Sequence, residues 1–84
     1  MFDNNLKPAR IVAPGQILKG ELDARNITIQ KLGQLLSLND SAVNDIINGE
    51  AIISGDLALQ LEKILGISAD FWLNLEANYR KWIE

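Results

Sequence analysis

The side chains best suited to chemistry in this chain are amides, hydroxyls and carboxylates in the stretch SLNDSAVNDIINGE, residues 37–50. An Asn side chain can hydrogen-bond adenine through two atoms, Ser can bond several base edges, and Asp can accept from the cytosine amino group. The same stretch carries three acids and neither Lys nor Arg. It therefore combines groups that could read bases with a charge that opposes phosphate binding.

The composition excludes most other chemistry. The 84 residues include neither Cys nor His, which removes thiolate and imidazole catalysis, disulfides and the usual zinc sites. The acids are scattered and no Gly-rich loop with Lys follows a strand, so we predict no enzyme, metal, cofactor or small-molecule substrate. No apolar run approaches the roughly 18 residues of a membrane span, and no signal peptide is evident. We therefore predict a cytoplasmic protein with no membrane partner.

The net charge of −3 is unevenly distributed. Residues 1–31 hold five bases and three acids, residues 32–62 hold five acids and no base, and residues 63–84 hold three of each. Because Lys and Arg supply most phosphate contacts, the middle segment gives little support to nucleic-acid binding. Phosphate contacts would fall to three basic residues, Lys7, Arg10 and Lys31.

Apolar spacing predicts a single all-α domain of five helices at 14–84, after an N-terminal arm at 1–13. The first three helices are expected at about 14–25, 29–36 and 40–48, and the others begin after caps at Ser54 and Ser68. Thr28 is a further N-cap, Asn26 is expected in the left-handed conformation, and Gly49 and Gly66 are C-terminal stops. A strand pattern is absent, although Ala51-Ile52-Ile53 could be extended. The predicted core includes Leu36, Val43, Ile47, Leu61 and Leu65.

Two short helices joined by a turn, at 29–36 and 40–48, are typical of a helix-turn-helix, although a small helical bundle without a nucleic-acid role fits the same spacing. From Pro14-Gly15-Gln16-Ile17-Leu18 through Ile46-Ile47-Asn48-Gly49 to Phe71-Trp72-Leu73-Asn74-Leu75-Glu76-Ala77-Asn78-Tyr79, the chain resembles HigA-type addiction-module antidote proteins of the Xre (lambda-repressor-like) class. The resemblance covers roughly residues 12 to 82, and the aromatic run is its most specific piece.

The resemblance implies a five-helix, lambda-repressor-like fold and a dimeric antitoxin. Such a protein binds operator DNA, represses its own operon and neutralises a cognate RelE-like, mRNA-cleaving toxin. The chain departs from the family pattern at Ser37, where Gly is usual, at Ile29, where Gln is frequent, and at Glu50, where a base is common. A similar module precedes zinc-peptidase domains in longer regulators. The alternative is therefore a protein-interaction module of the same fold with weak or no DNA binding. A zinc peptidase is one partner that such a module could have.

The predicted DNA-binding residues combine the start of the 29–36 helix with the groove-facing positions of the 40–48 helix. They are Thr28, Gln30, Lys31, Asn39, Asp40, Ser41, Asn44, Asp45 and Asn48. Asp40 and Asp45 have a second interpretation, because acids in the N-terminal half of a helix are favoured by its dipole on any solvated face.

Four of the five aromatic residues lie in the last 14 positions. Helical spacing places Trp72, Leu75, Tyr79 and Trp82 in one stripe, with Phe71 to its side. We predict that this stripe, within a C-terminal helix at 68–84, forms a homodimer interface, because Trp and Tyr are typical interface anchors. The alternative is that these residues close the core of their own domain. A membrane-surface helix is not supported, since the helix has no basic face.

Overall fold

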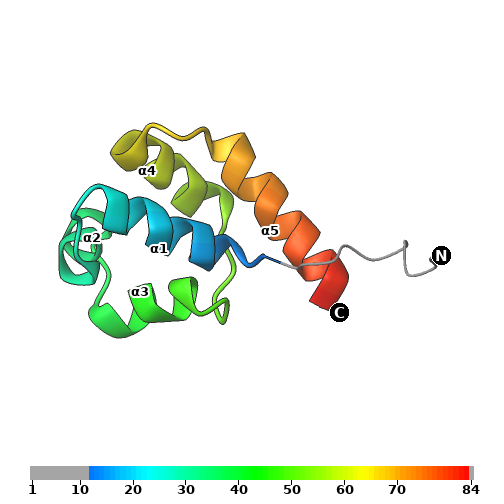
Figure 1. Ribbon diagram of the computed structural model, residues 1–84, viewed down its shortest axis with the longest axis horizontal. Coiled ribbons are helices and arrows are strands. Elements are labelled where there is room, and N and C mark those ends of the chain that lie inside the picture. Colours follow the sequence, from blue (N-terminus) through cyan, green and yellow to red (C-terminus); the bar gives the residue numbers. More distant parts are fainter. Residues whose placement is uncertain (1–11, 84) are drawn as a thin grey trace.

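The computed structural model describes residues 12–83 and consists of five helices (Figure 1). They are α1 (Pro14–Ala24), α2 (Ile29–Leu36), α3 (Asp40–Ile47), α4 (Gly55–Leu65) and α5 (Ala69–Ile83). The described residues contain no strand, and Ala51-Ile52-Ile53 lies in a loop, so the all-α prediction is confirmed. Most of the predicted arm, with Lys7 and Arg10, lies outside the described residues.

Local signals in the sequence set the helix ends. The hydroxyls of Thr28, Ser54 and Ser68 accept hydrogen bonds from backbone N–H groups three residues later, at 3.0, 3.2 and 3.2 Å. Each satisfies one of the free N–H groups of a first helical turn, so all three predicted N-caps are confirmed. Asn26 has the predicted positive φ of 58°, after which the chain turns into α2.

The core draws on every helix. Its fully buried side chains include Leu18 and Leu22 of α1, Leu32 of α2, Leu61 of α4 and Trp72 of α5. The predicted core residues Leu36, Val43, Leu61 and Leu65 are all buried in this cluster. Burying such side chains is the main favourable term in folding a small domain.

One predicted core position is wrong in detail. Ile46 is 5% exposed and belongs to the core, whereas Ile47 is only half-buried and packs against its edge. The inward face of α3 is therefore centred between Val43 and Ile46. At Ile47 it is the backbone of α3 that comes close to α1, since a Cβ on Gly15 would lie only 2.1 Å from the Ile47 carbonyl oxygen.

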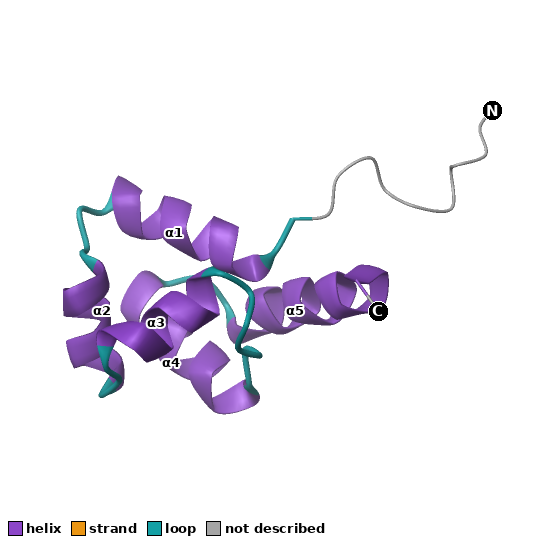
Figure 2. Cartoon of the chain, turned by 90° about the horizontal axis from the view of Figure 1, so that it is seen from below, coloured by secondary structure: helices purple, strands orange, loops and turns teal. Residues whose placement is uncertain are grey.

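The helices α1 to α4 form a body from which the C-terminal end of α5 projects (Figures 1 and 2). The first part of α5 packs on α4 and supplies Trp72 to the core. Within the described part of the chain, no helix is long and apolar enough to cross a membrane.

Candidate nucleic-acid interface

The turn between α2 and α3 fixes the relative orientation of these two helices. Ser37 adopts a left-handed conformation with φ of 59°, and the Leu38 N–H then donates back to the Gly33 carbonyl at 2.8 Å. A Cβ on Gly33 would lie 2.7 Å from the Leu38 carbonyl oxygen, so only glycine permits this close return. The two helices are thereby held in the helix-turn-helix arrangement that the sequence predicts.

Two predicted DNA-binding residues also cap helices. The Thr28 hydroxyl accepts from the Lys31 N–H, and the Asn39 side-chain carbonyl accepts from the Ala42 N–H at 2.8 Å. Both side chains are exposed, but these hydrogen bonds hold them against their own helices. Their first contribution is to fix the start of α2 and α3. The capping role of Asn39 was not predicted, although Asn is among the preferred N-cap residues.

The outer face of α3 presents five predicted residues to solvent. Asp40, Ser41, Asn44, Asp45 and Asn48 are all exposed, on the side opposite the buried Val43 and Ile46. Three of the five are neutral side chains that can both donate and accept hydrogen bonds. A helix of this form can lie along a major groove with its outer side chains against base edges.

These residues divide between the two edges of α3. Thr28, Gln30, Asp40 and Asn44 line one depression, of about 380 Å³, where the start of α2 meets α3 and α1. Asp45 lies on the other edge, in a separate groove beside α4. The structure therefore brings Thr28, Gln30, Asp40 and Asn44 together, and places Asp45 apart from them.

Positive charge near this face is sparse. Lys19 also lines the depression, but its ammonium is 2.7 Å from the Asp23 carboxylate. Arg25 pairs with Glu21 and donates to the Leu65 carbonyl at 3.0 Å. Lys31 is exposed and, among the described residues, has no ion-pair partner, so it is the base best placed to contact a phosphate. The acidic character of the middle segment is thus present on the folded surface.

The aromatic stripe of α5 is only partly available for an interface. Trp72 is fully buried in the core, with the Phe71 ring edge-on to it at 5.4 Å. The prediction that Trp72 contacts a partner subunit is therefore corrected, since its side chain has no surface to offer. Leu75, Tyr79 and Trp82 are half-buried in the single chain. These three remain the candidates for dimer contact.

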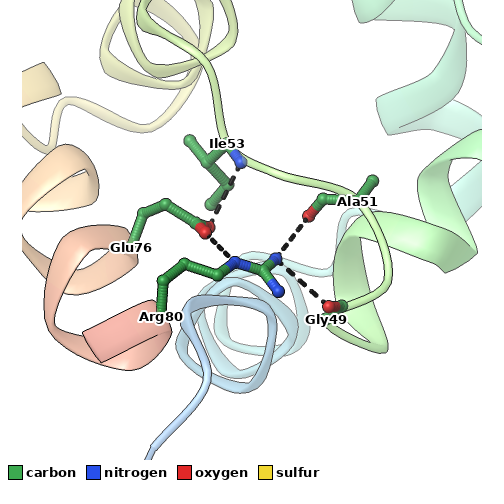
Figure 3. Close-up of polar contacts among 5 residues, drawn as sticks. All are labelled: Gly49, Ala51, Ile53, Glu76 and Arg80. Atoms are coloured by element: carbon green, nitrogen blue, oxygen red, sulfur yellow. Dashed lines mark hydrogen bonds and ion pairs between the residues drawn. The ribbon is translucent and has the colours of Figure 1, made fainter. Parts of the chain in front are cut away.

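A buried ion pair that the sequence did not reveal attaches α5 to the loop after α3 (Figure 3). Glu76 is 7% exposed, pairs with the Arg80 guanidinium and accepts from the Ile53 N–H at 3.2 Å. Arg80 in turn donates to the carbonyls of Gly49 and Ala51 at 3.2 and 3.3 Å. Because this loop directly follows α3, the pair connects the projecting helix to the end of the candidate recognition helix.

The only signal for this pair in the sequence was an acid and a base four residues apart on one helix. Glu21 and Arg25 have the same spacing, yet their side chains are each 36% exposed, against 9% for Glu76 and 25% for Arg80. Spacing alone does not distinguish a surface pair from a buried one.

The helix-turn-helix family (HTH_3) matches residues 18–72, which begin in α1 and end at the core Trp of α5. The chain belongs to this family, whose members are DNA-binding regulators rather than enzymes, as the sequence predicted.

Relatives narrow the class further. The chain is 31% identical over 74 residues to antitoxin HigA-1 of Vibrio cholerae, covering 87% of this chain and 70% of that protein. It is 34% identical over 70 residues to YbaQ of Escherichia coli (strain K12), an uncharacterized HTH-type transcriptional regulator, covering 82% of this chain and 62% of that protein.

A solved structure of Pseudomonas aeruginosa antitoxin HigA with the higBA promoter has a TM-score of 0.80 and 35% sequence identity, covering 88% of this chain and 82% of that one. The resemblance to HigA-type antitoxins is thereby confirmed. Neither the family nor these relatives support an association with a zinc peptidase.

Proposed function

We propose that this protein is a HigA-type antitoxin that binds operator DNA as a homodimer, represses its own operon and neutralises a RelE-like, mRNA-cleaving toxin in the cytoplasm. The observation that carries the DNA-binding part is the exposed polar face of α3, held by a capped helix-turn-helix. The structure of the similar Pseudomonas aeruginosa antitoxin HigA with promoter DNA supports the same use of this fold.

We assign base reading to the neutral side chains Ser41, Asn44 and Asn48. Each can exchange hydrogen bonds with base edges, and a good two-atom contact is worth about 1–3 kcal/mol of discrimination. Gln30 and Lys31 at the start of α2 are placed for phosphate, where the positive end of the helix dipole adds a favourable interaction. Asp40 and Asp45 oppose phosphate approach and are not assigned base contacts. Asp40 lies in the first turn of α3, where the helix dipole favours an acid, whereas Asp45 lies near the end of the helix and gains nothing from the dipole.

The homodimer uses the end of α5. Leu75, Tyr79 and Trp82 are half-buried in the single chain, and they follow one another along the middle and last turns of α5. The C-terminal end of this helix projects from the body (Figure 2). The Arg80 and Lys81 cations lie over the Tyr79 and Trp82 rings at 5.2 and 5.7 Å, which orients both aromatic side chains. A two-fold dimer would place two copies of α3 on successive half-sites of an operator.

The dimer is tested by sedimentation across a hundredfold range of micromolar concentrations. We expect a concentration-dependent dimer that Trp82→Ala weakens, while the equally apolar surface change Leu59→Ala on α4 leaves it intact. A monomer at every concentration would contradict this part of the proposal.

DNA recognition is tested by electrophoretic shift with the chain's own promoter and a random duplex. Asn44→Ala should reduce the preference for the promoter by about fivefold or more, since it removes a base contact. The matched control is Asn74→Ala, an exposed Asn on α5 that we place outside the DNA surface. Equal behaviour of the two variants would contradict the assignment of α3 as the reading helix.

Toxin neutralisation is tested separately, by co-expression with the toxin encoded in the neighbouring reading frame. Growth should be restored by the antitoxin and not by an unrelated helix-turn-helix protein.

One observation favours a second function. The segment 32–62 has no Lys or Arg, and its five acids are all exposed. A protein-interaction module of the same fold, with little DNA affinity, would need no phosphate contacts. Absence of any promoter shift at low salt, with toxin neutralisation retained, would select this alternative.

A further inference from the structure

A second groove runs along the edge of α3 that carries Asp45, between α3, the loop after it and the start of α4. Its volume is about 340 Å³, and it receives residues from α2, the α2–α3 turn, α3, the loop and α4. Its principal lining residues are Leu38, Ala42, Asp45, Ile52, Asp56 and Leu57.

The groove exposes apolar side chains that the fold does not need to expose. Ile52 is 67% exposed and Leu38 is 38% exposed, and both are among the large hydrophobic residues most open to solvent. Ile52 lies in the loop directly before Ile53, which is 2% exposed and completes the core. A contiguous exposed apolar surface with a polar rim is typical of a binding site for another molecule.

The rim of the groove is acidic. Asp45 and Asp56 line it, and within the described residues neither carboxylate forms an ion pair. No Lys or Arg occurs in the whole segment 32–62 that supplies the groove. Complementary charge on a partner would therefore be positive.

We propose that this groove binds a basic amphipathic helix of a partner protein. The apolar face of that helix would lie on Leu38, Ile52 and Leu57, and its Lys or Arg side chains would face Asp45 and Asp56, as in other helix-in-groove complexes. The inference rests on the proposed function only in that the chain binds a protein partner. It requires no DNA binding, because the groove is separate from Asn44 and Ser41.

Two other occupants fit the groove less well. Binding of nucleic acid is opposed by the two carboxylates, and no Lys or Arg is among the residues that line the groove. A second copy of the chain joined across a two-fold axis would bring the same acidic rim against itself, which is repulsive. A basic helix satisfies both the apolar floor and the charge.

The probe for the test is a labelled 18-residue amphipathic helical peptide with Leu on one face and Lys on the other, and a control peptide with Glu in place of Lys. Fluorescence anisotropy measures the affinity, and amide chemical shifts in NMR spectra locate the site on the full chain. We expect the Lys peptide to bind and to shift the amides of Leu38, Ile52 and Asp56, and we expect the Glu peptide not to bind.

Matched variants separate the groove from general attraction to an acidic protein. Ile52→Ser should weaken binding of the Lys peptide at least about fivefold, whereas Leu59→Ser, which changes a residue 53% exposed on the outer face of α4, should not. Asp56→Asn should weaken it about threefold, and Asp70→Asn should not. Asp56 and Asp70 each lie in the first turn of a helix, so each change removes the same kind of interaction between a carboxylate and a helix dipole.

The proposal would be overturned if the Lys peptide failed to bind, if the two peptides bound equally, or if Ile52→Ser and Leu59→Ser had equal effects. Loss of the homodimer in Ile52→Ser would also overturn it, because a second copy of the chain would then occupy the groove. Promoter binding by Ile52→Ser is measured in parallel and should be unchanged. Peptide binding without any promoter shift would leave the groove assignment intact while the DNA-binding proposal fails, so the two failures are distinguishable.

Discussion

The two ends of this molecule use polar residues in opposite ways. At the α2–α3 end, polar side chains cover the outside of α3, and the acids there remain in solvent. At the α5 end, Glu76 is enclosed, and its carboxylate holds both Arg80 and the Ile53 backbone (Figure 3). One end leaves its polar groups in solvent, where we propose that they meet DNA, and the other uses them to fix a helix in place. Substitutions at the first end should therefore change binding, and substitutions at the second should change stability.

The largest effect is expected at the buried pair. Glu76→Ala should lower the free energy of unfolding by about 3 kcal/mol, because it leaves the Arg80 guanidinium without its carboxylate and the Ile53 N–H without an acceptor. Urea unfolding of the purified variant measures this. The control is Glu21→Ala, which breaks the exposed pair of the same spacing and should cost no more than about 0.5 kcal/mol. Similar losses in the two variants would show that burial does not set the difference between these pairs.

Substitutions on the inner face of α3 should change stability, like those at the α5 end. Ile46→Ala should cost about 2–3 kcal/mol of unfolding free energy, since it removes a buried side chain and leaves a cavity. Ile47→Ala should cost about half as much, because that side chain is only half-buried. Thermal midpoints of the two variants test the register of α3. A larger loss for Ile47→Ala than for Ile46→Ala would mean that Ile47, and not Ile46, faces the core.

A smaller gain is expected at the α2–α3 turn. Ser37→Gly should raise the unfolding free energy by about 0.5–1 kcal/mol, because Ser37 has a left-handed φ of 59°, which costs energy for any side chain. Asn26→Gly, at φ of 58°, should gain less, since Asn tolerates this conformation better than Ser. Destabilisation by Ser37→Gly would contradict the strained conformation assigned to the turn.

A small change in stability and a modest change in DNA affinity are expected from the acids of α3. Replacing Asp40 and Asp45 together by Asn should tighten binding to random DNA about threefold, since it removes like charge near phosphates while keeping side-chain size. Unfolding should change by no more than about 1 kcal/mol, the range of a helix-dipole interaction. Asp70→Asn on α5 is the control and should leave DNA affinity unchanged. Unaltered affinity in the double variant would place both acids away from the phosphates.

Local signals in the sequence predicted most of this fold. Thr28, Ser54 and Ser68 were recognisable as caps, because an N-cap needs only a hydroxyl directly before a helix, where it accepts from a backbone N–H of the first turn. The period of apolar residues located all five helices. The face of α3 could not be predicted to the residue, since two adjacent isoleucines both satisfy a helical spacing and only the packing of the folded chain decides between them.

Burial that depends on distant contacts could not be predicted. Trp72 fits an interface stripe as well as a core, and only the packing of α5 on α4 makes it a core residue. The role of Glu76 depends on where the loop after α3 passes, 23 residues earlier in the chain. Among the candidate site residues, the exposure of the α3 face followed from periodicity, whereas the separation of Asp45 from Asn44 onto different edges required the positions of α1, α2 and α4.

The central claim is that α3 reads operator DNA in spite of its acidic surroundings, and the salt dependence of promoter binding tests it most directly. Affinity for the promoter and for a random duplex would be measured by electrophoretic shift from low to physiological salt. Only a few Lys and Arg side chains can reach phosphates. The slope of log affinity against log salt, roughly 0.9 for each phosphate contacted, should therefore be shallow, while the preference for the promoter persists. Absence of a promoter shift at low salt, with and without the partner protein, would contradict the claim.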